Sequence, residues 1–149
     1  MEFVTNNSKK SVKINPASFQ DAMFLKKEAM KCLTSSGALN NIDVNNLSKT
    51  DVKGLFDSLA NLIVALDTSN GFENAVFKCL ERCIYDNKHA ITRELFDDRP
   101  ELREDYYEIV SKCCEVNLSP FFKSLASVFS TQLNRITNAQ EQETMQAKS

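Results

Sequence analysis

The residues NGFENAVFKCLERCI at positions 70–84 give the clearest indication of the fold. Their apolar members recur every three or four positions, as on one face of an α-helix. Asn70 can accept from the free amides of a first turn, and the side chain of Glu73 can reach back to the Asn70 amide. The pattern predicts a helix that ends near 86–87. Its predicted buried residues are Phe72, Ala75, Val76, Cys79, Leu80, Cys83 and Ile84.

Two more helices are predicted on the N-terminal side. Asn15 and Pro16 resemble a helix cap and first residue, and this helix should end at 35–37, before a loop over 37–47. Its predicted buried stripe is Phe19, Ala22, Met23, Met30 and Leu33. The second helix, over 52–66, follows a start signal at Ser48 and has the strongest periodicity in the chain. Its buried residues should be Val52, Leu55, Phe56, Leu59, Leu62, Ile63 and Leu66.

The first fifteen residues predict a β-hairpin, because apolar and polar residues alternate around Phe3 and again around Val12 and Ile14. A lone hairpin is marginally stable, so this one should pack on the helices.

On the C-terminal side, residues 91–96 fit one helical turn or one strand equally well. A helix should begin at Pro100 and run over 101–117, with Tyr106, Ile109, Val110 and Cys113 facing inward. Proline disfavours a helical conformation in the preceding residue, so Ser119 and Pro120 predict a new helix that extends to Ile136. Residues 137–149 are too polar to repay the entropy of folding, which predicts a disordered tail.

The expected fold is therefore mainly α, a compact bundle of about five helices with a short N-terminal β-hairpin and a disordered C-terminal tail. We expect one domain over 1–136, with the hairpin at 1–15 and the helices at 16–136, followed by the tail at 137–149.

Composition narrows the classes of function. The 149 residues include 18 basic and 20 acidic side chains in close alternation, which leaves no broad positive surface for nucleic acid. No apolar run is long enough to span a membrane, and the first residues do not form a signal peptide, so we expect a cytoplasmic protein. An odd number of cysteines, five, predicts reduced thiols.

No set of residues predicts catalysis. Cys79, Cys83, Cys113 and Cys114 interrupt apolar stripes, where cysteine is usually a small core residue rather than a zinc ligand. The single histidine, His89, should lie in an exposed turn between helices. The acidic residues from Asp97 to Glu108 are interleaved with arginines and should form surface ion pairs. We expect no enzyme activity and no catalytic, cofactor-binding or metal-binding residue.

The segment after Asn117 is the best candidate for binding another protein. Its apolar residues cover more than one helix face, so the segment is either a partner surface or a central helix buried on all sides. The candidate partner-binding residues are Leu118, Phe121, Phe122, Leu125, Val128, Phe129 and Leu133.

Three stretches also resemble a known family. Val12 to Phe19, the sequence DYY at 105–107 and the sequence NLSPFFKSL at 117–125 are similar to tail assembly chaperones of long-tailed, siphovirus-type phages or prophages of Gram-positive bacteria. The resemblance covers about residues 1–136. It implies a chaperone that coats the tape measure protein while the tail tube polymerises around it and that is absent from the mature virion.

The resemblance names the tape measure protein as partner and the tail tube protein as a second candidate, and it leaves homo-oligomerisation open. Apolar grooves of a helical protein suit helix-in-groove recognition of such a partner. Two other hypotheses remain at this point. One is a helical adaptor or regulator of a bacterial or phage system, which could be associated with DNA, and the other is a cysteine- or metal-dependent enzyme.

Overall fold

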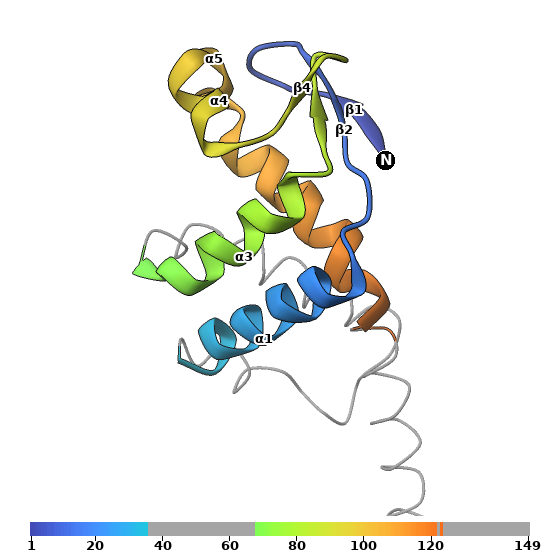
Figure 1. Cartoon of the computed structure of the whole chain (residues 1–149), viewed down its shortest axis with the longest axis vertical. Helices are drawn as coiled ribbons and strands as arrows, with labels where there is room; N and C mark the ends of the chain where they lie inside the picture. Colours follow the sequence, from blue (N-terminus) through green and yellow to red (C-terminus); the bar gives the residue numbers. More distant parts are fainter. Residues whose placement is uncertain (36–67, 122, 124–149) are drawn as a thin grey trace, which may run out of the picture.

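The computed structural model describes residues 1–35, 68–121 and 123 (Figure 1). The described elements, in chain order, are β1 (Glu2–Val4), β2 (Ser11–Lys13), α1 (Phe19–Ser35), α3 (Asn70–Leu80), β3 (Ile84–Tyr85), β4 (His89–Ala90), α4 (Arg93–Asp98) and α5 (Glu101–Glu104), and then a helix over 106–121. The predicted mainly helical fold with an N-terminal hairpin is confirmed for these residues. The predicted loop at 37–47, helix at 52–66 and tail at 137–149 lie outside them, and the domain boundaries stay a prediction.

The hairpin belongs to a larger sheet than the sequence predicted. β1, β2, β3 and β4 are neighbours in that order, and every pair is antiparallel. The helix predicted to continue to 86–87 ends at Leu80 instead, and the chain turns at Asp86 and Asn87, which have φ angles of 52° and 60°. Aspartate and asparagine tolerate this left-handed conformation, which suits a tight hairpin turn. The pair Asp86 and Asn87, which we interpreted as the end of a helix, therefore forms the turn between β3 and β4.

Two helix starts differ from the prediction by one to three residues. The amide of Asp21 donates to Ser18 Oγ, so Ser18 caps α1, while the Asn15 side chain donates to the Arg82 carbonyl instead. Ser69, not Asn70, caps α3 by accepting from the Phe72 amide. Serine and asparagine cap helices about equally well, so the sequence could not choose between neighbouring candidates.

The core lies between α1, α3, the sheet and the 106–121 helix. The predicted buried face of α3 is confirmed, since Phe72, Ala75, Val76, Cys79 and Leu80 are buried. Figure 1 shows the 106–121 helix, in orange, running from the end near α5 to the start of α1. Residues 91–96, left open by the sequence, contain the start of α4, which Thr92 caps. Among the described residues, no helix has the length and apolar content needed to cross a membrane.

The buried stripe of α1 was partly wrong. Ala22, Leu25 and Ala29 are buried, whereas Phe19 is 75% exposed and Met23 and Met30 are only half-buried. The buried positions are three and four residues apart and therefore lie on one face of the helix. Phe19 is the first residue of α1 and lies at its N-terminal end. The burial of Leu33 lies outside the described residues.

The chain after Pro100 also differs from the prediction. One helix was predicted over 101–117 and another from Ser119, but α5 stops at Glu104 and the next helix runs without a break through Pro120. Proline removes the hydrogen bond to the carbonyl of Val116, which is a local cost. Burial of Asn117 and Leu118 just before Pro120 holds this part of the helix in place.

A buried carboxylate fixes the hairpin to the start of the 106–121 helix. Asp105 is fully buried and accepts from both the hydroxyl and the amide of Ser8. The Ser8 hydroxyl also bonds to the Tyr85 hydroxyl at 3.2 Å. Next to this site, the Asn6 amide donates to Glu108 at 3.0 Å. The turn of the hairpin is thereby joined to residues about one hundred positions away.

We predict that Asp105→Ala lowers the free energy of unfolding by about 1–3 kcal/mol, because it removes the acceptor of the partly buried amide and hydroxyl of Ser8. Urea unfolding would measure the loss. The control is Asp97→Ala, which removes an ion pair to Arg103 from a side chain that is 81% exposed and should cost under about 0.5 kcal/mol. Equal losses for the two variants would contradict a structural role for Asp105.

Candidate binding surface

The seven residues predicted to bind a partner fall into three groups. Leu118 is fully buried, so in this structure its side chain packs in the core rather than on the surface. Phe121 is partly exposed. The side chain of Phe122 and residues Leu125, Val128, Phe129 and Leu133 lie outside the described residues. A partner-binding role for this set stays a prediction.

An aromatic pair, in which one ring is exposed and the other partly exposed, marks the described surface near the end of the 106–121 helix. The rings of Phe19 and Phe121 lie 6.2 Å apart and are tilted by 51°. Phe19 is 75% exposed, although it was predicted to be a core residue. Large exposed aromatic side chains are enriched in protein interfaces. The pair brings the start of α1 into a surface that the sequence assigned to the C-terminal segment alone.

Asn117 holds the two segments of this surface together. Its side chain is almost fully buried, and its Oδ1 accepts from the Ala17 amide at 2.9 Å. Its Nδ2 donates to the Cys113 carbonyl at 2.9 Å, so both ends of the amide have a partner. The residues just before Phe19 are thus fixed to the helix that carries Phe121. Sequence reasoning treated Asn117 only as the end of a helix and missed this contact.

A hollow of about 390 Å³ lies on another side of the same helix end. Its apolar wall comes from Met1, Val116 and Pro120, and its polar lining from Glu115, Ser119 and Lys123. Met1 is held there by two hydrogen bonds with Ile14, one from its amino group and one to its carbonyl. The hollow therefore depends on the pairing of the first residues with the strand β2.

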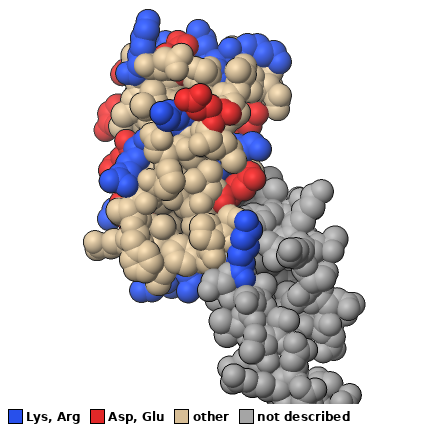
Figure 2. Space-filling view, turned by 90° about the vertical axis from the view of Figure 1, so that its right-hand side faces the viewer, with Lys and Arg blue, Asp and Glu red and all other residues tan. Residues whose placement is uncertain are grey.

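Two charged residues, Glu115 and Lys123, are among those that line the hollow. Glu115 lies 3.6 Å from Lys112, and both side chains are partly accessible. Lys123 is exposed. On the face in Figure 2, charges of both signs are interspersed in the upper part, and a broad area with few charges extends below them.

A second aromatic cluster joins α3, α4 and the 106–121 helix. Phe77, Phe96 and Tyr106 are mutually in contact, with centroid distances from 5.5 to 6.3 Å, and Tyr107, 45% exposed, lies against Tyr106. The guanidinium of Arg93 covers Phe77 at 4.2 Å. Tyr106, predicted to face inward, is partly buried. Because three of these rings pack on one another, the cluster mainly stabilises the fold.

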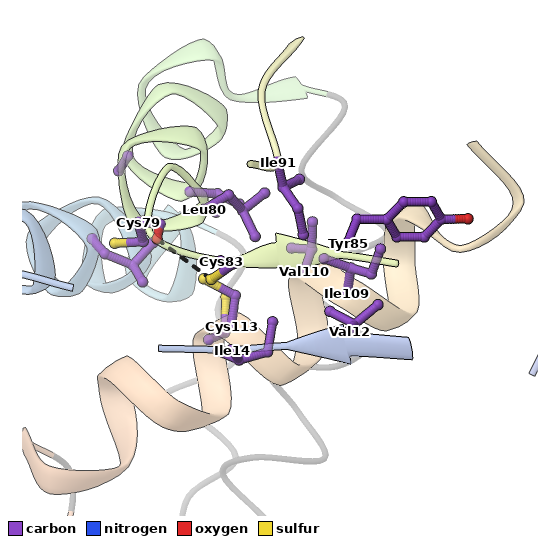
Figure 3. Packing of buried hydrophobic residues seen from close by; sticks show 14 of the residues in the cluster. Val12, Ile14, Cys79, Leu80, Cys83, Tyr85, Ile91, Ile109, Val110 and Cys113 are labelled. Carbon is purple, nitrogen blue, oxygen red and sulfur yellow. Dashed lines mark hydrogen bonds between the residues drawn. The ribbon is translucent and has the colours of Figure 1, made fainter. Parts of the chain in front are cut away.

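The cysteines meet in the core. Figure 3 shows the sulfur atoms of Cys83 and Cys113 close together, whereas the Cys79 sulfur points away from them, and the Cys79 thiol donates to the Asp21 carbonyl at 3.7 Å. Cys83 donates to the Cys79 carbonyl at 3.7 Å. Hydrogen bonds with Cys79 and Cys83 raise the pKa of Cys113, its bond to Cys113 lowers the pKa of Cys83, and burial raises the pKa of Cys114 to about 12. All five cysteines are free thiols, as predicted.

No arrangement for metal binding is present among the described residues, since no three or more His, Cys, Asp or Glu side chains are placed to hold an ion. His89, predicted in an exposed interhelical turn, lies instead in β4, and its Nε2 is 2.9 Å from Arg99. The predicted surface pairing of acidic residues and arginines is confirmed with different partners. Arg99 pairs with Glu101, and Arg103 pairs with Asp97.

A model of a known family, described as phage tail assembly chaperone protein, TAC, matches residues 7–130. The chain belongs to this family. The match includes β2, α1, α3 and the whole 106–121 helix, and with them the aromatic pair and most of the lining of the hollow. No curated protein and no solved structure matches the chain. Family membership implies a role in phage tail assembly through binding of tail proteins.

We predict that Asn117→Ala lowers the free energy of unfolding by about 1–3 kcal/mol, because the Ala17 amide loses its acceptor in a buried site. The control is Glu115→Ala on the same helix, where the replaced side chain is about half exposed and the change should stay within about 0.5 kcal/mol. Thermal or urea unfolding would measure both. A loss for Asn117→Ala as small as that of the control would show that the contact with Ala17 does not stabilise the fold.

We predict that one thiol reacts quickly with an aromatic disulfide reagent at pH 8 and that four react only when the protein unfolds. Cys32 is partly exposed, whereas the other four cysteines are at most 3% exposed. Access limits the reaction of a buried thiol even where its pKa is lowered, as for Cys83. Cys32→Ser should remove the fast reaction, and urea should expose all remaining thiols. A fast reaction that persists in Cys32→Ser would contradict the burial of the cluster.

Proposed function

We propose that the chain binds the tape measure protein and keeps it soluble until the tail tube has polymerised around it. The observation that carries this proposal is the family match over residues 7–130. The family description gives the process, tail assembly, and the tape measure protein is the component whose length and apolar helices create a need for a chaperone. The tail tube protein is the second candidate partner.

The surface of the chain supports binding rather than chemistry. The exposed ring of Phe19, its contact with Phe121 and the nearby hollow provide accessible apolar area on a well-packed scaffold. A chaperone of this kind needs such area, because amphipathic helices are shielded by burying their apolar faces in grooves. We therefore infer that the chain acts without catalysis.

The same proposal includes the place and time of action. The chain acts in the host cell cytoplasm, as a late protein, on a tape measure protein that has not yet been enclosed, and it is absent from the finished virion. Five free thiols fit a reducing compartment. The sequence resemblance further suggests siphovirus-type phages of Gram-positive hosts.

Co-expression tests the proposal. The tape measure protein of the same phage should be insoluble alone, soluble with the chain, and retained on an affinity tag fused to it. Phe19→Asp should weaken retention at least tenfold, because it places a charge in apolar contact area. Gln20→Asp, at the neighbouring exposed residue, is the matched control and should bind normally. A tape measure protein that is soluble alone and never associates with the chain would overturn the proposal.

A further inference from the structure

We propose that Cys83 and Cys113 form a reversible disulfide when the protein meets hydrogen peroxide, and that this bond staples the segment after α3 to the 106–121 helix. The inference assigns a modification site to two residues of the core. It goes beyond the proposed function and is independent of it, because it does not depend on which tail protein the chain binds.

The two thiols come from segments that meet in the core. Cys83 lies between α3 and β3, and Cys113 lies within the 106–121 helix. Both side chains are fully buried. Figure 3 shows their sulfur atoms close together, and the two thiols share a hydrogen bond. Two sulfur atoms that are already in contact are the pair for which a disulfide requires the least movement of the chain.

The other cysteines are less well placed to join this pair. Cys79 also contacts Cys113, but its thiol donates to the Asp21 carbonyl at 3.7 Å, and Figure 3 shows its sulfur directed away from the pair. Cys114 follows directly after Cys113, and adjacent residues of an α-helix project about 100° apart. Cys32 is partly exposed on α1. The geometry therefore selects one pairing among the five cysteines.

The surroundings give the two thiols different roles. Hydrogen bonding to Cys113 lowers the pKa of Cys83 more than burial raises it. The Asn15 backbone and the positive charge of the Met1 amino group lower it further. Hydrogen bonds with Cys79 and Cys83, together with burial, raise the pKa of Cys113 well above its ordinary value. Because the thiolate is the nucleophile, Cys83 attacks the oxidant and Cys113 reacts second.

The reaction takes two steps. The Cys83 thiolate attacks one oxygen of hydrogen peroxide, the O–O bond breaks, and the departing hydroxide takes up a proton to become water. Cys83 is then a sulfenic acid. The Cys113 sulfur attacks the Cys83 sulfur, the S–O bond breaks, and the departing hydroxide takes the Cys113 proton as the disulfide forms. The two thiols lose two electrons, and the peroxide gains them and becomes two waters.

Access to the pair depends on the size of the oxidant. Cys83 comes directly after the exposed residues Glu81 and Arg82, so a small local opening of this turn admits a molecule about the size of water. An aromatic disulfide is much larger and therefore reaches the buried thiols only when the protein unfolds. In a reducing cytoplasm, exchange with small thiols returns the disulfide to two thiols once the peroxide is gone.

The bond should stabilise the folded domain. A disulfide between residues 83 and 113 restricts the unfolded chain, and the restriction grows with the length of the closed loop. We expect the melting temperature of the oxidised protein to lie about 5–10 °C above that of the reduced protein. The staple acts on the helix that also carries Asn117 and Phe121, so it reinforces the support of the candidate binding surface.

Oxidation of the Cys32→Ser protein tests the proposal, because this variant lacks the partly exposed thiol that would link two molecules. After treatment with hydrogen peroxide, the mass of the monomer should fall by two hydrogen atoms. Dithiothreitol should restore the original mass and the lower melting temperature. A melting temperature of the oxidised monomer equal to or below that of the reduced protein would overturn the staple.

Peptide mapping identifies the pair. Trypsin cuts after Arg82 and therefore places Cys79 and Cys83 in different peptides. Without reduction, peptide 83–88 should be joined to peptide 113–123. Joining of 113–123 to the peptide that holds Cys79 would overturn the proposal, and so would recovery of four free thiols after peroxide treatment.

Matched variants distinguish the two neighbouring cysteines of peptide 113–123. In the Cys32→Ser protein, Cys113→Ala should abolish the link to peptide 83–88, whereas Cys114→Ala should retain it. The reverse result would assign the bond to Cys114 and contradict the proposal. Circular dichroism would check that each variant is folded, and the mapping of the Cys32→Ser protein does not depend on either core variant.

Discussion

The structure depends on hydrogen bonds that fasten the N-terminal segment along the 106–121 helix. Ser8 bonds to Asp105 at one end, and Ala17 bonds to Asn117 at the other, across sequence separations of 97 and 100 residues. The helical rise between residues 105 and 117 is about 18 Å, and the segment from Ser8 to Ala17 runs in the same direction beside it. β2 lies between the two attachment points. The long helix is therefore the support on which the hairpin and the start of α1 are aligned.

The candidate binding surface is a consequence of that alignment. Phe19 follows directly after the segment that Asn117 holds, and Met1 is paired with Ile14 within it. The ring pair and the hollow are thus built from residues at opposite ends of the described chain. A surface of this kind forms only when the domain is folded, because its residues come together through contacts between distant parts of the chain.

The buried thiols and the aromatic cluster contribute to the scaffold. Cys79, Cys83 and Cys113 come from α3, the residues just after it and the 106–121 helix, and their convergence fills the core where these segments meet (Figure 3). Small, polarisable side chains fit such a junction without a cavity. The stacked rings of Phe77, Phe96 and Tyr106 close the neighbouring junction with α4. Neither the thiols nor these rings cover the Phe19–Phe121 pair, which lies near the other end of the 106–121 helix.

The sequence by itself determined the mainly helical class, the N-terminal hairpin, the buried face of α3 and the family, because periodicity, turn residues and local motifs carry that information. It could not predict the two-residue strands β3 and β4, since β3 depends on pairing with β2, and β4 on pairing with β3. It could not choose Ser18 over Asn15 as a cap or predict that the helix continues through Pro120, because long-range contacts decide both. Only the tertiary structure placed Leu118 in the core, Phe19 on the surface and Met1 beside Pro120. These positions depend on contacts between residues far apart in the chain, and local pattern does not record such contacts.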